Sequence, residues 1–268
     1  MKGRVLIIAG SDSGGGAGIQ ADIKTVTALG GFAATAITAL TAQNTLGVFG
    51  IFPVPPAFVR QQMDVVLADI GADVIKTGML GERAIVETVA ETLAVYPDLP
   101  LIADPVMVAK GGASLLSDEA VGAMLACLVP RAHVLTPNAP EAARLTGLCV
   151  EDLDGQKRAA EKLLRAGAKG VLIKGGHLAG PRICDVLADA NGMLVFESPR
   201  LDVRANHGTG CTLASAIAAL LGQNVPLRDA VRQAQDYVFE AMRRAPGFGA
   251  GHAPLDHAWP MRDARIKA

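Results

Sequence analysis

The feature that most constrains the fold is a regular alternation of short apolar runs with stretches whose apolar residues recur at helical spacing. The pattern predicts strands at residues 4–10, 32–40, 72–76, 101–103, 133–135 and 170–174. Between them it predicts helices near residues 19–29, 58–70, 85–93, 117–128, 140–145 and 156–165. Strands that alternate with helices favour a parallel sheet with helices on both faces and right-handed crossovers.

The second half of the chain adds a hairpin and two longer helices. Asn191-Gly192 stands between apolar runs at 183–188 and 193–198, which is typical of a β-hairpin and predicts antiparallel strands at one edge. Helices are predicted at 213–221, ended by Gly222, and from Pro226 to about residue 238. Beyond about Met242 no period is visible, and no structure is predicted there. Because no linker or repeat interrupts the chain, we expect a single domain over residues 1–268.

Composition and charge argue against several classes of protein. The residues are 50% hydrophobic but only 4% aromatic, which suits a close-packed parallel sheet. The formal net charge is -1 and no basic run is present, which argues against a nucleic-acid partner. We expect no membrane span and no leader, since no apolar run is long enough and a strand begins almost at once. The cysteines form no C-x-x-C pair, which argues against zinc and disulfides and favours a reducing, cytoplasmic location; they are Cys127, Cys149, Cys184 and Cys211.

The segment 207–212 (HGTGCT) leads into the helix at 213–221. Its two glycines permit a sharp turn, so several backbone N–H groups can point at one spot at the positive end of the helix dipole. Such a spot is an anion site, and in a kinase the anion would be the phosphoryl group in transfer. The other interpretation is an ordinary turn in which Thr209 caps the helix. A cysteine in the first turn, here Cys211, is expected to have a lowered pKa.

Polar residues follow most of the predicted strands, where ligands bind in sheets of this kind. These segments are 11–22, 41–44, 76–79, 104–106, 136–138 with Glu141, and 174–177. Asp104 and Glu141 are candidates for Mg²⁺, which phosphoryl transfer places between phosphate oxygens, and Lys174 could reach a phosphate. Structural interpretations remain open, namely a turn before proline for Asp104, a solvated first-turn acid for Glu141 and a strand-end lysine for Lys174. The P-loop and G-x-G-x-x-G motifs are both missing.

Three further side chains suggest a pocket for a small heterocycle. Gln43 follows an apolar strand, and its amide can donate and accept at a ring edge. Met79 could supply a flexible apolar wall or belong to the core. Asp22 is placed on the polar side of a helix whose apolar side carries residues 19, 23 and 26, so a surface acid is the other interpretation. His177 and His207 could be loop residues only.

Taken together, the motifs resemble the hydroxymethylpyrimidine/phosphomethylpyrimidine kinases of thiamine biosynthesis, within the ribokinase superfamily. The segments that carry the resemblance are 10–22 (GSDSGGGAGIQAD), 39–45 (ALTAQNT), 76–80 (KTGML), 104–107 (DPVM), 136–138 (TPN) with Glu141, 174–177 (KGGH) and 207–212 (HGTGCT). The cysteine in the last segment is distinctive, because most of the superfamily has aspartate there.

The resemblance implies a three-layer α/β/α, ribokinase-like domain that uses ATP and Mg²⁺. It implies a pyrimidine pocket at Ala17, Asp22, Gln43, Met79 and Val106. It also implies metal or phosphate roles for Asp104 and Glu141, nucleotide contacts at Lys174, Asn138 and Thr209, and a catalytic anion hole at Gly208, Thr209, Gly210 and Cys211. Two successive transfers, from hydroxyl to monophosphate to diphosphate, and a homodimer are the family's usual properties.

Two segments depart from the family pattern, and two other functions stay open. Residues 111–113 (GGA) replace an expected serine and acid, and Asn206 replaces the usual threonine. Some pyridoxal kinases carry the same cysteine-bearing motif, so pyridoxal phosphorylation is one alternative. A non-catalytic, pyrimidine-binding regulatory protein is the other, although the intact polar segments argue against it.

Overall fold

A computed structural model of the chain describes residues 3–108, 112 and 115–266. Residues 111–113 depart from the family pattern, and only Gly112 of these three lies within the described residues. No helix within the described ranges is long and apolar enough to cross a membrane.

A large, mostly parallel sheet forms the centre of the molecule, as predicted. Its strand order is β3-β2-β1-β4-β5-β6-β7-β8-β9. The parallel part comprises β1 (Arg4–Asp12), β2 (Phe32–Asn44), β4 (Val74–Thr77), β5 (Leu101–Ala103), β6 (Val134–Leu135) and β7 (Gly170–Ile173). The hairpin of β8 (Arg182–Asp189) and β9 (Gly192–Pro199) adds antiparallel strands at one edge, which confirms that prediction.

The opposite edge carries a strand that the sequence pattern did not indicate. β3 (Gly47–Pro53) pairs antiparallel with β2, which itself continues beyond Leu40 to Asn44. Residues 49–53 of β3 are all exposed, so it shows no alternation of buried and solvent-facing residues. Without that alternation, a strand gives no periodic signal in the sequence.

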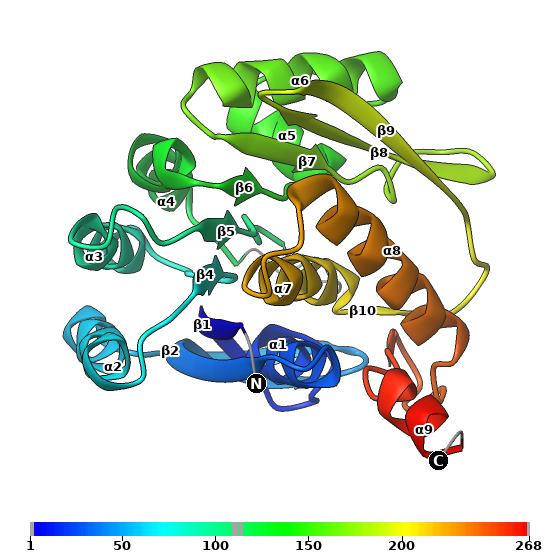
Figure 1. The fold of residues 1–268 in the computed structure, drawn as a ribbon, viewed down its shortest axis with the longest axis horizontal. Coiled ribbons are helices and arrows are strands. Elements are labelled where there is room, and N and C mark those ends of the chain that lie inside the picture. Colours follow the sequence, from blue (N-terminus) through cyan, green and yellow to red (C-terminus); the bar gives the residue numbers. More distant parts are fainter. Residues whose placement is uncertain (1–2, 109–111, 113–114, 267–268) are drawn as a thin grey trace.

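Helices cover both faces of the sheet and complete the predicted three layers (Figure 1). One face is covered by α2 (Pro56–Asp69), α3 (Arg83–Ala94), α4 (Asp118–Ala123), α5 (Ala139–Thr146) and α6 (Leu153–Arg165). The other is covered by α1 (Gly18–Ala28), α7 (Thr209–Leu221) and α8 (Leu227–Arg243). Strand β1 sends Leu6 and Ile8 into the first layer and Val5 and Ile7 into the second, so it is buried on both sides.

Two helices differ from a simple periodic pattern. The predicted helix at 117–128 is capped by the Ser117 side chain, as expected, but it is α-helical only to Ala123 and continues as a π turn over Met124–Leu128 and a 3-10 turn over Val129–Arg131. Helix α7 is buried on nearly every side because it lies between the sheet, α1 and α8. Its many alanines allow that close approach.

The C-terminal segment, for which no structure was predicted, returns to the start of α7. Strand β11 (Ala253–Pro254) pairs in parallel with β10 (Ala205–His207), and α9 (Trp259–Ile266) follows. The pairing of β10 with β11 joins residues far apart in the chain, so no local sequence pattern predicts it. It places the tail directly beside the segment 207–212.

Candidate active site

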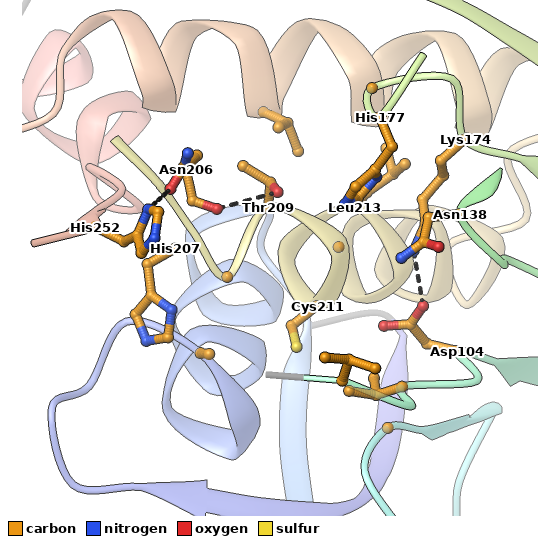
Figure 2. Close-up of a pocket in the computed structure, with 18 of the residues that line it drawn as sticks. Asp104, Asn138, Lys174, His177, Asn206, His207, Thr209, Cys211, Leu213 and His252 are labelled. Atoms are coloured by element: carbon orange, nitrogen blue, oxygen red, sulfur yellow. Dashed lines mark hydrogen bonds and ion pairs between the residues drawn. The ribbon is translucent and has the colours of Figure 1, made fainter. Parts of the chain in front are cut away.

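A cavity of about 890 Å³ opens at the carboxyl ends of the parallel strands and at the start of α7. Every predicted site residue except Asp22 lines it; these are Ala17, Gln43, Met79, Asp104, Val106, Asn138, Glu141, Lys174, Gly208, Thr209, Gly210 and Cys211. Figure 2 shows labelled side chains along the start of α7, from His207 past Cys211 to Asp104 and Lys174.

The first turn of α7 has the geometry of an anion site. Gly208 is the N-cap with φ +81, and a Cβ there would lie 1.9 Å from the Gly16 carbonyl oxygen, so the position requires glycine. A Cβ on Gly210 would lie 3.2 Å from Lys174 Nζ, so the backbone of this turn lies close to the Lys174 ammonium. Thr209 does not cap the helix as one interpretation had it, because its hydroxyl donates to the Asn206 carbonyl at 3.3 Å and no side chain caps Gly208. The N-terminal N–H groups therefore face the cavity at the positive end of the dipole.

Cys211 is a neutral thiol, contrary to the expectation of a lowered pKa. Burial raises the pKa of Cys211 to about 11; the charges of Asp22 and Asp104 add to this, while Lys76 and the Gly18 N–H oppose it. The residue is partly accessible, but to the cavity rather than to bulk solvent. The prediction was wrong because it weighed the helix dipole, a local effect, without the desolvation that the surrounding layers impose.

Lys174 and Asp104 form an ion pair at one end of the cavity. Lys174 Nζ lies 3.0 Å from Asp104 Oδ1 (Figure 2). Thr136 donates its hydroxyl to the same oxygen at 3.0 Å. Burial alone would lower the pKa of Lys174, but the carboxylates of Asp104 and Glu141 outweigh burial and raise it. The lysine is therefore charged and held where it can meet a phosphate beside Gly210.

Glu141 is buried rather than solvated, which corrects one structural interpretation. It forms a capping box with Asn138 at the start of α5: Glu141 Oε2 accepts from the Asn138 N–H at 2.7 Å, and Asn138 Oδ1 accepts from the Glu141 N–H at 2.9 Å. Burial raises the pKa of Glu141 to about 7, with Asp104 adding to the effect and Lys174 opposing it. Glu141 and Asn138 therefore hold the start of α5 through these hydrogen bonds, and both also line the cavity.

The donor set at this end fits a magnesium ion that is held mainly by phosphate and water. Asp104 and Glu141 supply carboxylates at the cavity wall, and Asp104 Oδ2 lies toward Gly210. Among the described residues no group of three or more His, Cys, Asp or Glu side chains forms a metal cage. A site with few protein carboxylates is what Mg²⁺ bound to phosphates requires.

The opposite end of the cavity contains a network that sequence reasoning did not assign. Asp12 Oδ2 lies 2.9 Å from His207 Nε2, and the Asp12 carboxylate accepts N–H bonds from Gly14, Gly16 and Ala17 at 2.8–3.0 Å. Burial alone would raise the pKa of Asp12, but His207 and these N–H groups lower it. The Gln43 amide nitrogen lies 3.2 Å from the same histidine nitrogen. An aspartate two residues before a glycine cluster was the one local signal for this turn.

Asp22 lies beneath the cavity rather than in its wall. It is fully buried, whereas Ile23, placed on the apolar side by the periodicity, is 37% exposed. The expected helix face was wrong because Lys76, at the end of β4, neutralises the buried carboxylate: Nζ lies 2.8 Å from Asp22 Oδ2. Lys76 itself lines the cavity.

The C-terminal segment holds the turn before α7 in place. His252 Nδ1 lies 2.8 Å from Asn206 Oδ1, and His257 Nε2 lies 3.0 Å from Thr212 Oγ1 (Figure 2 shows the first contact). Asn206, one of the departures from the family pattern, therefore has a partner from the tail. These contacts hold the residues on either side of the turn that begins α7.

Comparison with known proteins identifies relatives of this chain. Residues 12–256 match the family described as phosphomethylpyrimidine kinase. The thiamine biosynthesis bifunctional protein ThiED of Geobacter sulfurreducens is 50% identical over 98% of this chain, which spans 54% of that longer protein. The hydroxymethylpyrimidine/phosphomethylpyrimidine kinase of Bacillus subtilis is 47% identical, over 95% of this chain and 94% of the relative. A solved Bacillus subtilis pyridoxal kinase in complex with ADP is 34% identical with a TM-score of 0.90, covering 98% of this chain and 99% of that one.

Proposed function

Because the chain belongs to the phosphomethylpyrimidine kinase family, we propose that it uses ATP to phosphorylate 4-amino-5-hydroxymethyl-2-methylpyrimidine and then converts the monophosphate to the diphosphate. Both reactions belong to thiamine biosynthesis, which the relatives' names support. The observation that carries the proposal is the N-terminal turn of α7, whose N–H groups lie beside the Lys174 ammonium. Such a turn stabilises negative charge on a phosphoryl group in transfer.

The two ends of the cavity suit the two substrates. At one end, Ala17, Met79 and Val106 supply apolar contacts and Gln43 supplies an amide, a combination that suits a methylated aminopyrimidine. At the other end, apolar side chains from α8 and the segment before β10 offer a wall for the adenine ring; they are Val238, Phe239, Met242, Leu201 and Val203. The anion-binding turn lies between these ends, where the γ-phosphate of ATP would meet the acceptor oxygen.

The residues of this chain act mainly by placing and stabilising charge. Lys174 binds phosphate oxygens of ATP, the N–H groups of residues 209–211 receive the transferred group, and Asn138 orders the start of α5 beside them. Asp104 and Glu141 would hold Mg²⁺, which when bound neutralises phosphate charge. Phosphoryl transfer passes through a loose transition state, so a neutral Cys211 is compatible with catalysis.

An ADP-release assay tests the proposal. Release should depend on added acceptor and should occur with the hydroxymethylpyrimidine and with its monophosphate. Pyridoxal is included because the similar solved structure is a pyridoxal kinase. Faster turnover of pyridoxal than of both pyrimidines would make this a pyridoxal kinase, and no acceptor-dependent release at all would favour the regulatory alternative.

A homodimer in the cytoplasm completes the proposal. Supporting it, β2, β3 and the turn between them expose five apolar side chains that we call the flap patch, each 46–71% exposed. Leu40 and Phe52 lie on one face of the β2–β3 ribbon, Phe49 and Ile51 lie on the other, and Leu46 lies in the turn. An apolar surface on an edge strand is costly to leave in water and is typical of an interface. A second copy of the chain is the partner that the family's usual assembly supplies.

A further inference from the structure

Lys76 carries a charged group that the proposed mechanism has not yet used. Its side chain is fully buried, and its Nζ lies 2.8 Å from Asp22 Oδ2. Ser215 donates its hydroxyl to the other oxygen of Asp22 at 2.7 Å. The cluster joins the end of β4 to α1 and α7, directly beneath the turn that carries Cys211.

The Lys76 side chain has no exposed surface, although the residue belongs to the wall of the cavity. Lys76 belongs to the cavity wall together with Gly78. A Cβ on Gly78 would lie only 3.0 Å from Lys76 Nζ, so a side chain there would press against the ammonium. Glycine leaves that space open. An ammonium has three donor hydrogens, and Asp22 is the acceptor that the described residues place at hydrogen-bond distance.

Stability alone explains this buried pair poorly. Two charges lose their hydration on burial, and an apolar pair of similar volume is often at least as stable. The pair lies beside Gly78, the residue before Met79 of the acceptor end, whereas Lys174 is itself engaged by Asp104. The acceptor end thus contains a cation of its own, next to a thiol that is neutral.

We propose that Lys76 binds the phosphate of the monophosphate acceptor during the second transfer. This inference rests on the proposed function. In that step an oxygen of the acceptor phosphate forms a bond to the γ-phosphorus of ATP, the bond from that phosphorus to the β,γ-bridging oxygen breaks, and the electron pair leaves with ADP. The acceptor is a dianion near neutral pH, so it has no proton to lose but needs a cation beside it. The hydroxyl acceptor of the first transfer needs none.

The test compares the two acceptors in one variant. Asp22→Asn and Lys76→Met are combined, because removing one partner alone would leave a buried charge uncompensated. We expect kcat/KM for the monophosphate to fall about 100-fold, the scale of a lost charge-assisted hydrogen bond, and that for the hydroxymethylpyrimidine to change by less than about fivefold. The matched control is Ser215→Ala, which removes a bond within the same cluster but keeps the ammonium; it should affect both acceptors by the same factor.

Equal losses for both acceptors in the double variant would assign Lys76 a purely structural role and overturn the proposal. If the double variant fails to fold, a structure of the unaltered protein with monophosphate and ADP decides. Lys76 Nζ within about 3.2 Å of an acceptor phosphate oxygen supports the proposal, and a separation beyond about 4.5 Å overturns it. An unaltered protein that phosphorylates neither acceptor would instead contradict the proposed function.

Discussion

Cys211→Asp should separate the two phosphoryl transfers. Burial raises the pKa of Cys211 to about 11, so the thiol is neutral at pH 7.5. The substitution places a carboxylate where the protein now has no charge. The first acceptor is a neutral hydroxyl and can tolerate or even use a base, whereas the second is a phosphate dianion that a carboxylate repels.

The size of the effect follows from Coulomb's law. Two like charges about 4 Å apart interact by about 4 kcal/mol at the effective dielectric constant of a protein site. Since about 1.4 kcal/mol corresponds to a factor of ten, the second transfer should fall about 1,000-fold relative to the first. This is an upper bound, because the charges of Asp22 and Asp104 raise the pKa of an acid at this position and Lys76 compensates part of the charge.

Steady-state ADP release with each acceptor at pH 7.5 measures the ratio of the two transfers. Cys211→Ser is the matched control, because it keeps a small neutral side chain and should change both transfers by a similar factor. Equal losses in the two steps of Cys211→Asp, or a larger loss in the first, would refute the argument from charge. Cys211 would then be a small residue at the start of a helix and nothing more.

Three further predictions concern other parts of the site and the surface. Asp104→Asn and Glu141→Gln should each raise the Mg²⁺ concentration needed for half-maximal rate. Burial raises the pKa of Glu141 to about 7, so the Mg²⁺ concentration needed for half-maximal rate should fall as the pH rises from about 6 to 8. Glu141→Gln should remove this dependence on pH. Full activity of both variants at low Mg²⁺ would contradict the assignment. Gln43→Ala should raise KM for the pyrimidine about 10-fold, from about 1–3 kcal/mol of lost hydrogen bonding, with little change in KM for ATP. Phe49→Asp with Phe52→Asp should give a folded monomer by light scattering, and an unchanged molecular mass would exclude the flap patch as the interface.

The core of the fold was predictable because its signals are local. Buried parallel strands such as residues 4–10 and 170–174 are continuous apolar runs, and the helices between them repeat apolar residues at helical spacing. The edge strand β3 and the pairing of β10 with β11 were not predictable in this way. Strand β3 is too exposed to show an alternation of buried and exposed residues. The pairing of β10 with β11 joins segments whose contact depends on the whole fold.

The residues of the candidate site show the same difference between local and long-range signals. Residues at strand ends, among them Asp104 and Lys174, could be found because the sheet brings those ends together. The partners of His207 and Asp22 could not be found, since 195 residues separate His207 from Asp12 and 54 separate Asp22 from Lys76. A charged residue can occupy the buried face of a helix once a distant partner neutralises it, and periodicity does not report that partner.

The return of the C-terminal tail to the first turn of α7 ties activity to the integrity of the chain's end. Thr212 and His257 are 45 residues apart, so a nascent polypeptide that has just completed α7 still lacks the strand and the histidine that hold its first turn. Proteolytic clipping before residue 253 would leave the sheet and its two helical layers but remove this support. Loss of turnover with loss of no more helix than α9 would therefore be an early sign of damage at the C-terminal end.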